Sequence, residues 1–550
     1  MYENIKTLRE LYEFATDTYQ NAPMSEMLDS DQMYTYSSFR RACDDMSARL
    51  SAAGVAPGEK VAIYSQNMPN WTLALFSAVA FGRVAVPILS ESSSLEVENI
   101  LTHSETSCLF VSRAKLPAVP QKCLDAMKLV ICLDDLGVLA DHTEGAVPVH
   151  ANIPEPEDMA GLFYTSGTTG KAKGVMLSHR NLSHMVIVAW RSTRFKTGYR
   201  GLSTLPMAHT YEMSLSLLYP FYMGACMYYI KKAPTTSVLV DALSRVKPQV
   251  ICSVPLIIEK VYRSAVRKTI DKSKVLTWME KHMRRVLYLL IGRKIRKFFG
   301  GELIFFGIGG AKLDPVVEKF LREARFPYAP GYGLTETAPL ITYSVVNHFP
   351  MYSIGEPVYG IEVRLGDMDP ATGEGEIQVK GPNVMMGYYK DPERTASVFT
   401  PDGWLRTGDL ALRKGKFLFI KGRIGTMIVG ASGENIYPEE IESVINDFSG
   451  VNESLVVKRE GKLVALVKFD ESVLNWDQER EDKIFEKIEA KKKEIMDFVN
   501  NRVKKSNNIN DVEIVKEPFI KTATMKIRRF LYEKTGKGDK TDKAGKPDNK

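Results

Sequence analysis

Residues 164–179 read YTSGTTGKAKGVMLSH, and this stretch constrains the fold more than any other part of the chain. It combines hydroxyl side chains, glycines that let backbone N–H groups approach an anion, and lysines that bring positive charge. Apolar runs flank it at 161–164 and 175–177, which is not typical of a flexible Gly/Ser/Thr linker. The stretch therefore predicts a phosphate-binding loop.

The glycine spacing excludes a Walker loop. That motif places four residues between its first glycine and a Gly-Lys-Ser/Thr tripeptide. Here Gly167 precedes Gly170-Lys171 by three positions, and Ala172 stands where the Mg²⁺-binding hydroxyl would be. The stretch therefore indicates nucleotide chemistry of another class.

Four further motifs follow along the chain. They are GYGLTET at 331–337, GWLRTGD at 403–409, Gly-Arg at 422–423 with GENIYPEEIE at 433–442, and KTATMKIRR at 521–529. With the loop, and in this order, they resemble the signatures of the acyl-adenylate-forming (AMP-binding) superfamily, which includes acyl-CoA synthetases, luciferases and the adenylation domains of peptide synthetases. The run from Lys526 to Tyr532 is similar to that of bacterial long-chain fatty acid CoA ligases. The resemblance covers nearly the whole chain.

The resemblance implies a site for ATP and Mg²⁺. Attack of a carboxylate on the α-phosphorus brings two anions together, so the site must neutralise charge. The residues implied to hold the β- and γ-phosphates are Thr165, Ser166, Gly167, Thr168, Thr169, Gly170 and Lys171. The other implied roles are Glu336 for Mg²⁺, Thr335 for the α-phosphate, Tyr332 and Gly333 for the nucleotide, and Asp409 and Arg423 for the ribose. Gly309, Gly310 and Ala311 would line the adenine and acyl pocket, although on sequence alone they equally predict a tight strand-to-helix turn.

Lys526 is expected to carry adenylation, because its ammonium could bridge the attacking carboxylate and the α-phosphate. The family motif here usually contains Pro and Gly, where this chain has Ile520 and Met525. In the family, the C-terminal domain rotates between adenylation and thiolation about a residue two positions after the boundary arginine. That residue is Gly425, where many relatives have Lys or Asp. Glycine makes large φ/ψ changes easy, but an ordinary turn glycine explains it as well.

The resemblance also implies where the acyl group and CoA bind. The segment 205–214, LPMAHTYEMS, contains His209 and Tyr211 and is expected to gate the acyl pocket. No Ser-His-Asp or metal-ligand pattern surrounds His209, so we interpret it as a packed residue and not as a base. Ser432 and Gly433 would approach the pantetheine of CoA after the rotation.

The composition is that of an ordinary globular protein, with 44% hydrophobic and 25% charged residues among 550. The six cysteines are scattered without a CxxC pair, and the first ten residues lack the apolar core of a signal peptide. We therefore expect reduced thiols and a cytoplasmic protein, with peripheral binding at the inner face of the membrane as an open question.

Helical and strand patterns alternate from residue 34 onward, as in layered α/β folds. The predictions include a helix at 36–53, strands at 60–64 and 84–89, and a small antiparallel β subdomain around 361–365 and 375–380. Open sheets of this kind bind ligands outside the carboxyl ends of their strands, where the glycine-rich motifs fall.

Three regions are expected along the chain. An N-terminal domain for AMP and acyl binding covers 1–422, and a mobile α+β domain over 423–535 carries Lys526. The tail 536–550 has almost no apolar residues and is expected to be disordered.

Two segments raise the question of membranes. Met213–Ile230 carries no formal charge and is nearly long enough to span a bilayer, but Pro220 and Gly224 interrupt it, and its second half indicates a buried strand. Residues 260–299 are strongly basic, with apolar residues at mixed helical spacing. They indicate either a helix on an anionic membrane or a packed helix with a solvated basic face. Nucleic-acid binding is not expected, because no recognised module accompanies the charge.

The sequence predicts an ATP-dependent, AMP-forming acid–thiol ligase. A fatty acid and ATP would give acyl-AMP and pyrophosphate, and CoA would then displace AMP. One rival passes the acyl group to acyl carrier protein instead. A rival of another class is a catalytically silent fatty-acyl-binding or membrane-tethered interaction protein that kept the fold; the intact Glu336, Asp409 and Lys526 argue against it.

Overall fold

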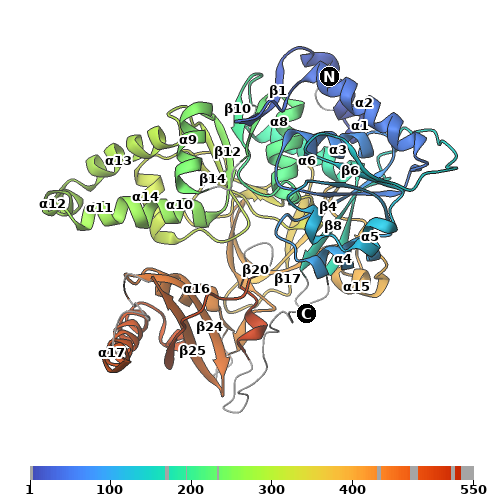
Figure 1. The fold of residues 1–550 in the computed structure, drawn as a ribbon. Coiled ribbons are helices and arrows are strands. Elements are labelled where there is room, and N and C mark those ends of the chain that lie inside the picture. The colour runs from blue at the N-terminus through green and yellow to red at the C-terminus, as the bar shows by residue number, and fades with distance from the viewer. Residues whose placement is uncertain are drawn as a thin grey trace. The chain divides into compact units, whose positions relative to one another are not determined.

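The computed structural model describes residues 4–166, 172–193, 195–231, 235–429, 435–470, 473, 481–521 and 527–533. The chain forms two compact units, which Figure 1 shows with the second in orange to red. The first comprises Met1–Thr407 and Leu412–Ile420, and the second Gly408–Ala411 and Lys421–Lys550. The mixed sheets and covering helices agree with the predicted α/β class. The boundary at 422/423 stays a prediction, and the tail 536–550 lies outside the described residues.

The sheet that carries the phosphate-loop motif has eight strands. In spatial order they are β19 (Gly387–Tyr388), β9 (Ala172–Ser178), β8 (Met159–Ser166), β4 (Val84–Ile88), β3 (Lys60–Tyr64), β5 (Thr106–Val111), β6 (Leu129–Cys132) and β7 (Val138–Asp141). The five strands from β8 to β6 run parallel, and the outer strands pair antiparallel. All residues of β4 are buried, as its unbroken apolar run VAVPI predicts for a strand covered on both faces.

A second large sheet has seven strands. In spatial order they are β14 (Tyr328–Pro330), β13 (Phe305–Ile308), β12 (Val250–Ser253), β10 (Arg200–Leu202), β11 (Cys226–Ile230), β1 (Pro23–Leu28) and β2 (Met33–Thr35). Only β2 pairs antiparallel, at the edge. The GGA and GYGLTET motifs therefore follow directly from the carboxyl ends of β13 and β14, the edge where parallel sheets bind ligands.

Smaller sheets complete the strands of the first unit. One is the pair β15 (Thr342–Tyr343) and β16 (Glu356–Pro357), and the other has the order β17 (Glu362–Gly366), β18 (Gly375–Lys380), β20 (Leu405–Lys414) and β21 (Phe417–Arg423). β17 and β18 pair antiparallel, which confirms the predicted β subdomain. The chain passes into the second unit within β20 and again within β21.

Helices flank the sheets of the first unit. They are α1 (Leu8–Tyr19), α2 (Tyr36–Ala52), α3 (Pro69–Val79), α4 (Ser94–Ser104), α5 (Gln121–Asp125), α6 (His179–Thr193), α7 (Thr210–Glu212), α8 (Tyr219–Tyr222), α9 (Thr236–Val246), α10 (Pro255–Val261), α11 (Lys268–Asp271), α12 (Lys274–His282), α13 (Arg284–Phe298), α14 (Pro315–Glu323) and α15 (Pro392–Val398). π-helical turns η2 (Met213–Leu218) and η3 (Tyr262–Arg267) precede α8 and α11.

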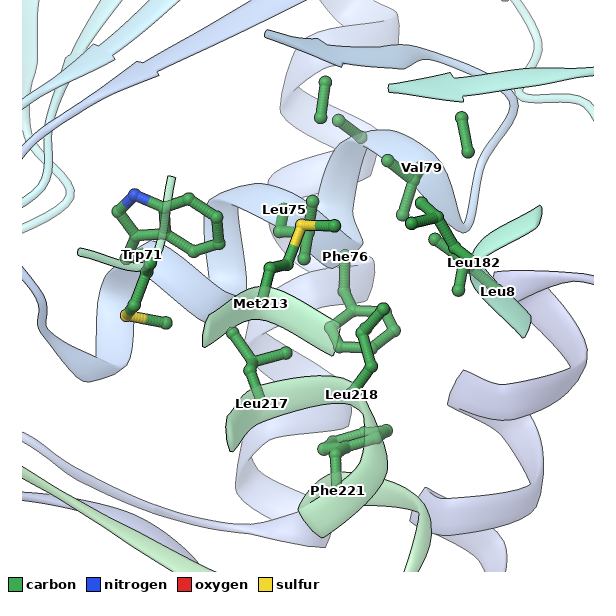
Figure 2. Close-up of a cluster of buried hydrophobic side chains, with 14 of the residues drawn as sticks. Leu8, Trp71, Leu75, Phe76, Val79, Leu182, Met213, Leu217, Leu218 and Phe221 are labelled. Atoms are coloured by element: carbon green, nitrogen blue, oxygen red, sulfur yellow. The ribbon is translucent and has the colours of Figure 1, made fainter. Parts of the chain in front are cut away.

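A buried apolar cluster joins α1, α3, α6, η2 and α8 (Figure 2). Every residue of α3 is buried, and the rings of Phe76 and Phe221 stack with centroids 4.7 Å apart. Met213 and Leu218 of η2 are fully buried in the same cluster. The LPMAHTYEMS segment leads directly into η2. The burial of η2 in this cluster therefore anchors the C-terminal end of that segment.

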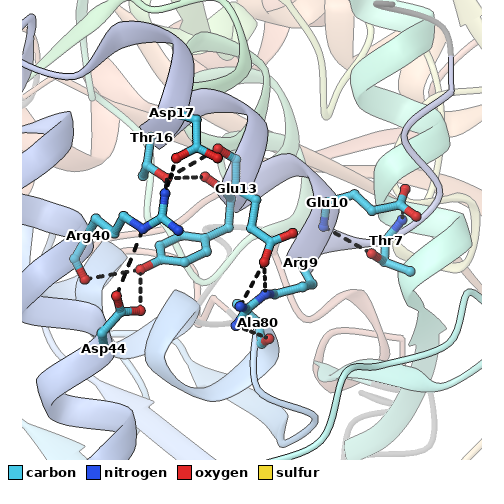
Figure 3. Close-up of polar contacts among 10 residues, drawn as sticks. Thr7, Arg9, Glu10, Glu13, Thr16, Asp17, Arg40, Asp44 and Ala80 are labelled. Carbon is cyan, nitrogen blue, oxygen red and sulfur yellow. Dashed lines mark hydrogen bonds and ion pairs between the residues drawn. The ribbon is translucent and has the colours of Figure 1, made fainter.

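The N-terminus of α1 is held by reciprocal hydrogen bonds (Figure 3). Glu10 N donates to Thr7 Oγ1 at 3.1 Å, and Thr7 N donates back to the Glu10 carboxylate at 3.4 Å. Leu8 N donates to His179 Nδ1 at 3.2 Å, which ties α1 to the start of α6. A capping interaction of this kind contributes about 1 kcal/mol.

The apolar segment Met213–Ile230 does not form one continuous helix. It divides into η2, α8 and strand β11, with Gly224 at φ +70° between the last two. Among the described residues, no helix is both long and apolar enough to cross a bilayer.

The second unit is a small α+β structure. Its strands β24 (Val451–Arg459), β25 (Lys462–Phe469) and β26 (Asp511–Ile514) form one sheet, and β22 (Ile428–Val429) pairs with β23 (Asn435–Ile436). Helices α16 (Pro438–Asn446) and α17 (Glu481–Asn500) pack on the sheet through Ile441, Ile445, Ile495 and Val499.

Candidate active site

The phosphate-loop motif lies at the end of a β-hairpin. β8 and β9 pair antiparallel, with Thr165 opposite Lys173 and Ser166 opposite Ala172. The predicted phosphate-binding residues Gly167, Thr168, Thr169, Gly170 and Lys171 lie outside the described residues. Thr165 Oγ1 is buried and has no hydrogen-bond partner among the residues that the structure describes. A buried hydroxyl of this kind needs a partner, and a bound ligand can provide one.

Lys173 connects this hairpin to the GYGLTET motif. Its Nζ donates to Glu336 Oε1 at 2.7 Å and to the Tyr388 hydroxyl at 2.8 Å. The Tyr388 hydroxyl donates to the same Glu336 oxygen at 2.9 Å, and its ring centroid lies 4.5 Å from the Lys173 ammonium. Tyr388 reaches this place because β19 pairs with β9, with Tyr388 opposite Val175. Three segments that are far apart in sequence thus meet at one carboxylate.

Two effects compete at Glu336, which is 9% exposed. Burial raises the pKa of its carboxyl, but the charge and hydrogen bond of Lys173, the residue's own backbone N–H and Tyr388 outweigh burial and leave the pKa below its ordinary value. Burial, together with the Glu336 charge, raises the pKa of Tyr388. At neutral pH the site therefore holds an ionised carboxylate beside a neutral phenol.

The turn after β14 gathers the other predicted residues of this motif. Glu336 lies in the short 3₁₀ turn η4 (Thr335–Thr337), whose Thr335 is half-buried. Tyr332 forms an isolated bridge with Thr342. A Cβ at Gly333 would lie 1.7 Å from the carbonyl oxygen of Pro339, so only glycine fits there. The predicted residues Tyr332, Gly333, Thr335 and Glu336 therefore lie in one tight segment.

The GGA motif forms the turn after β13. Gly309 N donates to the Ser253 carbonyl at 3.2 Å, and Gly310 has a φ of +85°, which favours glycine. A Cβ at Gly309 would lie 3.3 Å from the Tyr211 ring, so the aromatic residue of the LPMAHTYEMS segment packs against this turn. Ala311 is exposed. The structure thus brings Tyr211 and Gly309 together, and their shared role in an acyl pocket stays a prediction.

The LPMAHTYEMS segment contains a buried acid that the sequence did not single out. Glu212 is fully buried, and its Oε1 accepts a hydrogen bond from Ser203 Oγ at 2.6 Å. Asn67 Nδ2 donates to Ser203 Oγ at 2.8 Å and to the Leu205 carbonyl at 2.6 Å. Burial raises the pKa of Glu212 to about 7, although hydrogen bonds from Ser203 and other groups oppose this. His209 is half-buried immediately before α7.

The second unit brings together the two residues expected at the ribose. Arg423 Nε donates to Asp409 Oδ1 at 2.8 Å, and Asp409 is buried whereas Arg423 is exposed. Gly425 lies in the next turn, outside the left-handed φ region, and a Cβ there would contact nothing within 4 Å. This turn therefore does not require glycine for steric reasons. Lys526, Ser432 and Gly433 lie outside the described residues.

The donor set around Glu336 suits a hard cation shared with phosphates. Across the described ranges, no cluster of three or more His, Cys, Asp or Glu side chains could hold a metal by protein ligands alone. Mg²⁺ is usually bound by one or two carboxylates together with substrate phosphates and waters. The ionised Glu336 carboxylate fits such a shared site. Thr165 Oγ1, which has no partner among the described residues, lies on the adjoining hairpin opposite Lys173.

Sequence reasoning missed the two partners of Glu336. Lys173 stood within the motif as a general positive charge, but its strand register, which gives it a specific role, was not predicted. Tyr388 lies in the run GYYKD, which matched none of the motifs. Its role depends on the pairing of β19 with β9, and no local pattern signals that pairing.

Comparison with known proteins bears on this geometry. The family model described as AMP-binding enzyme matches residues 14–389. A long-chain-fatty-acid–CoA ligase, FadD15 of Mycobacterium bovis, is 31% identical over 471 residues, which cover 78% of this chain and 76% of the relative. The long-chain-fatty-acid–[acyl-carrier-protein] ligase AEE15 of Arabidopsis thaliana, a chloroplast protein, is 27% identical and covers 90% of this chain and 81% of its own.

A solved structure shows the same fold. The o-succinylbenzoate CoA synthetase MenE of Bacillus subtilis, in complex with ATP and magnesium, superposes with a TM-score of 0.73 at 21% identity, covering 94% of this chain and 98% of its own. The matched family model covers more than half of this chain and includes the hairpin, the GGA turn and the GYGLTET turn. The chain therefore belongs to the AMP-binding enzyme family of adenylate-forming ligases.

Proposed function

We propose that this protein is an ATP-dependent, AMP-forming long-chain fatty acid CoA ligase. The observation that carries the proposal is the ionised Glu336 carboxylate, held by Lys173 beside the phosphate-loop hairpin. The choice of a long-chain fatty acid and CoA rests on the relative FadD15, which is named a long-chain-fatty-acid–CoA ligase. The proposed reaction joins a fatty acid to ATP with loss of pyrophosphate and then transfers the acyl group to CoA.

The proposed first half-reaction depends on charge neutralisation. Glu336 would bind Mg²⁺, which when bound offsets the negative charge of the triphosphate. Thr165 and the residues 166–171 would hold the β- and γ-phosphates through hydroxyl and backbone N–H donors and the Lys171 ammonium. Lys526 would stabilise the charge that develops between the attacking carboxylate and the α-phosphate. Tyr388 and Lys173 would keep Glu336 ionised and oriented.

The proposed second half-reaction needs a rearrangement of the C-terminal part. Asp409 and Arg423 would bind the ribose hydroxyls, and Gly425 would act as the hinge. The free surroundings of Gly425 support this role, because the turn itself gives no steric reason for glycine. Ser432 and Gly433 would then contact the pantetheine arm, with the CoA thiolate attacking the acyl-AMP carbonyl and AMP leaving.

Two assays on the purified full chain test the proposal. Exchange of labelled pyrophosphate into ATP should occur only when a long-chain acid is present, and thioester should form with CoA alone. Lys526→Ala should lower exchange on the order of 10²-fold or more, because it removes the bridging charge, while supplied acyl-AMP is still converted to acyl-CoA. Equal loss of both half-reactions would remove Lys526 from the adenylation step. Absence of acid-dependent exchange in the unmodified protein would support a silent binding protein instead.

A second acceptor, acyl carrier protein, is favoured by one observation. The relative AEE15 covers 90% of this chain and is named for that acceptor. Side-by-side reactions with CoA and with a purified holo acyl carrier protein separate the two acceptors. Thioester formation only with the carrier protein would replace CoA in the proposal.

A further inference from the structure

Helices α12 and α13 carry an exposed surface of unusual chemistry. In Figure 1, α12 lies at the left edge of the first unit, away from its large sheets. Val275 and Trp278 on α12 are 67% and 56% exposed, and Val286 and Leu290 on α13 are each 46% exposed. We call the surface formed by these four side chains and the exposed cations Lys281, Arg293, Lys294 and Lys297 the α12–α13 face.

The exposed apolar residues of α13 do not result from a loosely packed helix. The opposite side of α13 is well packed: Leu287, Tyr288 and Ile295 are buried. A Cβ at Gly292 would lie 2.2 Å from the Ala324 carbonyl oxygen, so α13 lies directly against the end of α14. The outward side chains follow a regular helical spacing, since 286, 290, 293 and 297 recur on one side. The helix therefore has a core side and a separate outward stripe.

Most of the positive charge of this region is not neutralised by the residues that the structure describes. Residues 272–301 contain nine lysines and arginines and a single acid, Glu280. Glu280 is already engaged, accepting hydrogen bonds from Arg267 at 2.8 Å and from the Tyr288 hydroxyl at 2.6 Å. Arg284 pairs with Glu323 at 2.7 Å. None of the other cations in this segment, all of which the structure describes, forms an ion pair with a described residue.

Trp278 adds a second property. Its indole lies against the His282 ring, with centroids 5.0 Å apart, at a helix whose residues are all at least partly exposed. Tryptophan is enriched where proteins meet the lipid headgroup region, because one side of the indole is apolar and its N–H is polar. Two alternatives explain this surface less well. A basic helix face that only contacts water needs neither an exposed indole nor an exposed apolar stripe. A nucleic acid would bind the cations through its phosphates, but it offers no apolar layer for the stripe.

We propose that the α12–α13 face docks on the surface of an anionic phospholipid bilayer. The cations would lie against lipid phosphates, while Trp278, Val275, Val286 and Leu290 enter the boundary between headgroups and acyl chains. The proposal goes beyond the proposed function. Docking on a bilayer requires no turnover, so a failure of the ligase assays would not contradict the docking proposal. A failure to bind vesicles would likewise not contradict the proposed ligase function.

The test measures co-sedimentation of the full-length protein with vesicles. Phosphatidylcholine vesicles with phosphatidylglycerol should bind the protein at low salt, and pure phosphatidylcholine or high salt should release most of it. The triple variant Arg293→Glu, Lys294→Glu, Lys297→Glu should lower the partition coefficient at least about 100-fold, at about fivefold for each cation removed. Trp278→Ser should lower it about tenfold, because its apolar ring is lost from the interface.

A matched control separates the face from net charge. The triple variant Arg41→Glu, Lys319→Glu, Lys462→Glu makes the same charge change at scattered exposed positions. It should retain vesicle binding within about threefold of the unmodified protein, since only cations near the lipid surface contribute. Thermal unfolding midpoints of both triple variants should match the unmodified protein, because all six residues are exposed.

Several outcomes would overturn the proposal. They are no binding of the unmodified protein to anionic vesicles at low salt, equal binding to uncharged vesicles, and equal loss of binding in the two triple variants. Retention of binding after both the Trp278→Ser change and the α13 charge reversals would also overturn it.

Discussion

Two glutamates, Glu336 and Glu212, are both buried in the first unit, but their pKa values are shifted in opposite directions. The pKa of Glu336 is lowered, because an ammonium and a phenol contact its carboxylate. The pKa of Glu212 is raised to about 7, because burial outweighs the hydrogen bonds of neutral groups such as Ser203. Hydrogen bonds from neutral donors thus do not replace a cation at a buried carboxylate. Glu336, the ionised acid, lies in the motif that binds nucleotide in the proposed function. Glu212, the acid that can take up a proton near neutral pH, lies in the hydrogen-bond network of Ser203 and Asn67.

The largest expected effect comes from making Glu336 resemble Glu212. Lys173→Met removes the cation, so burial dominates and the pKa of Glu336 rises above its unfolded value. The free energy of unfolding of the variant then falls as pH rises from the pKa of Glu336 in the unfolded state to its raised pKa in the folded state. We expect a loss of about 3 to 4 kcal/mol at neutral pH, where the carboxyl must either stay charged and unpaired or take up a proton. Thermal unfolding midpoints at pH 5 and pH 8 measure it.

The exposed Lys319→Met is the control for this change, because Lys319 has no ion pair with a described residue. Its midpoint should stay close to that of the unmodified protein at both pH values. A Lys173→Met variant with the same pH dependence as the unmodified protein would show that Lys173 does not determine the ionisation of Glu336.

Glu212→Gln tests the other side of the comparison. Because the folded pKa of Glu212 lies near 7, above its ordinary 4.5, the unmodified protein loses stability between these pH values as the unfolded state releases its proton first. The loss approaches about 3 kcal/mol above pH 7. The amide cannot ionise, so this part of the pH dependence should disappear from the unfolding midpoint. The exposed Glu460→Gln should keep it.

Glu336→Gln tests whether the ionised acid of this comparison binds Mg²⁺. A neutral amide is a poorer ligand for a hard cation than a carboxylate. We expect at least about a tenfold rise in the Mg²⁺ concentration needed for half-maximal pyrophosphate exchange. The exposed Glu393→Gln should leave that concentration unchanged. An unaltered Mg²⁺ requirement in Glu336→Gln would separate the ionised acid from the metal.

Tyr388→Phe should have the smallest effect. It removes one hydrogen bond to Glu336 but leaves the Lys173 ammonium in place, so the carboxylate stays ionised. The free energy of unfolding should fall by about 1 kcal/mol, measured as a shift in the denaturation midpoint at neutral pH. A loss as large as that of Lys173→Met would mean that the phenol, and not the charge, determines the state of this acid.

The sequence predicted local features well and long-range pairings poorly. The strand at 60–64 is β3 as observed, and the helix at 36–53 differs from α2 by one residue, because apolar periodicity and caps are local signals. Glu336 was predicted through its motif. Its partner Tyr388 was not predicted. The position of Tyr388 depends on the pairing of β19 with β9, two strands far apart in the sequence, in which Tyr388 lies opposite Val175. Glu212 was missed because a single acid in an apolar segment gives no sign of whether it is buried.

The register of the β8–β9 hairpin has a consequence for the length of the loop that joins the strands. Side chains alternate between the two faces of a strand, so a shift of β9 by one residue would turn Lys173 to the opposite face of the sheet from Glu336. The pairing of β9 with β19 would shift as well, and Tyr388 would lose its place. The register therefore constrains the number of residues between Ser166 and Ala172, apart from any constraint on their side chains. In a library of variants, we expect insertions and deletions of a single residue between these two strands to be strongly depleted.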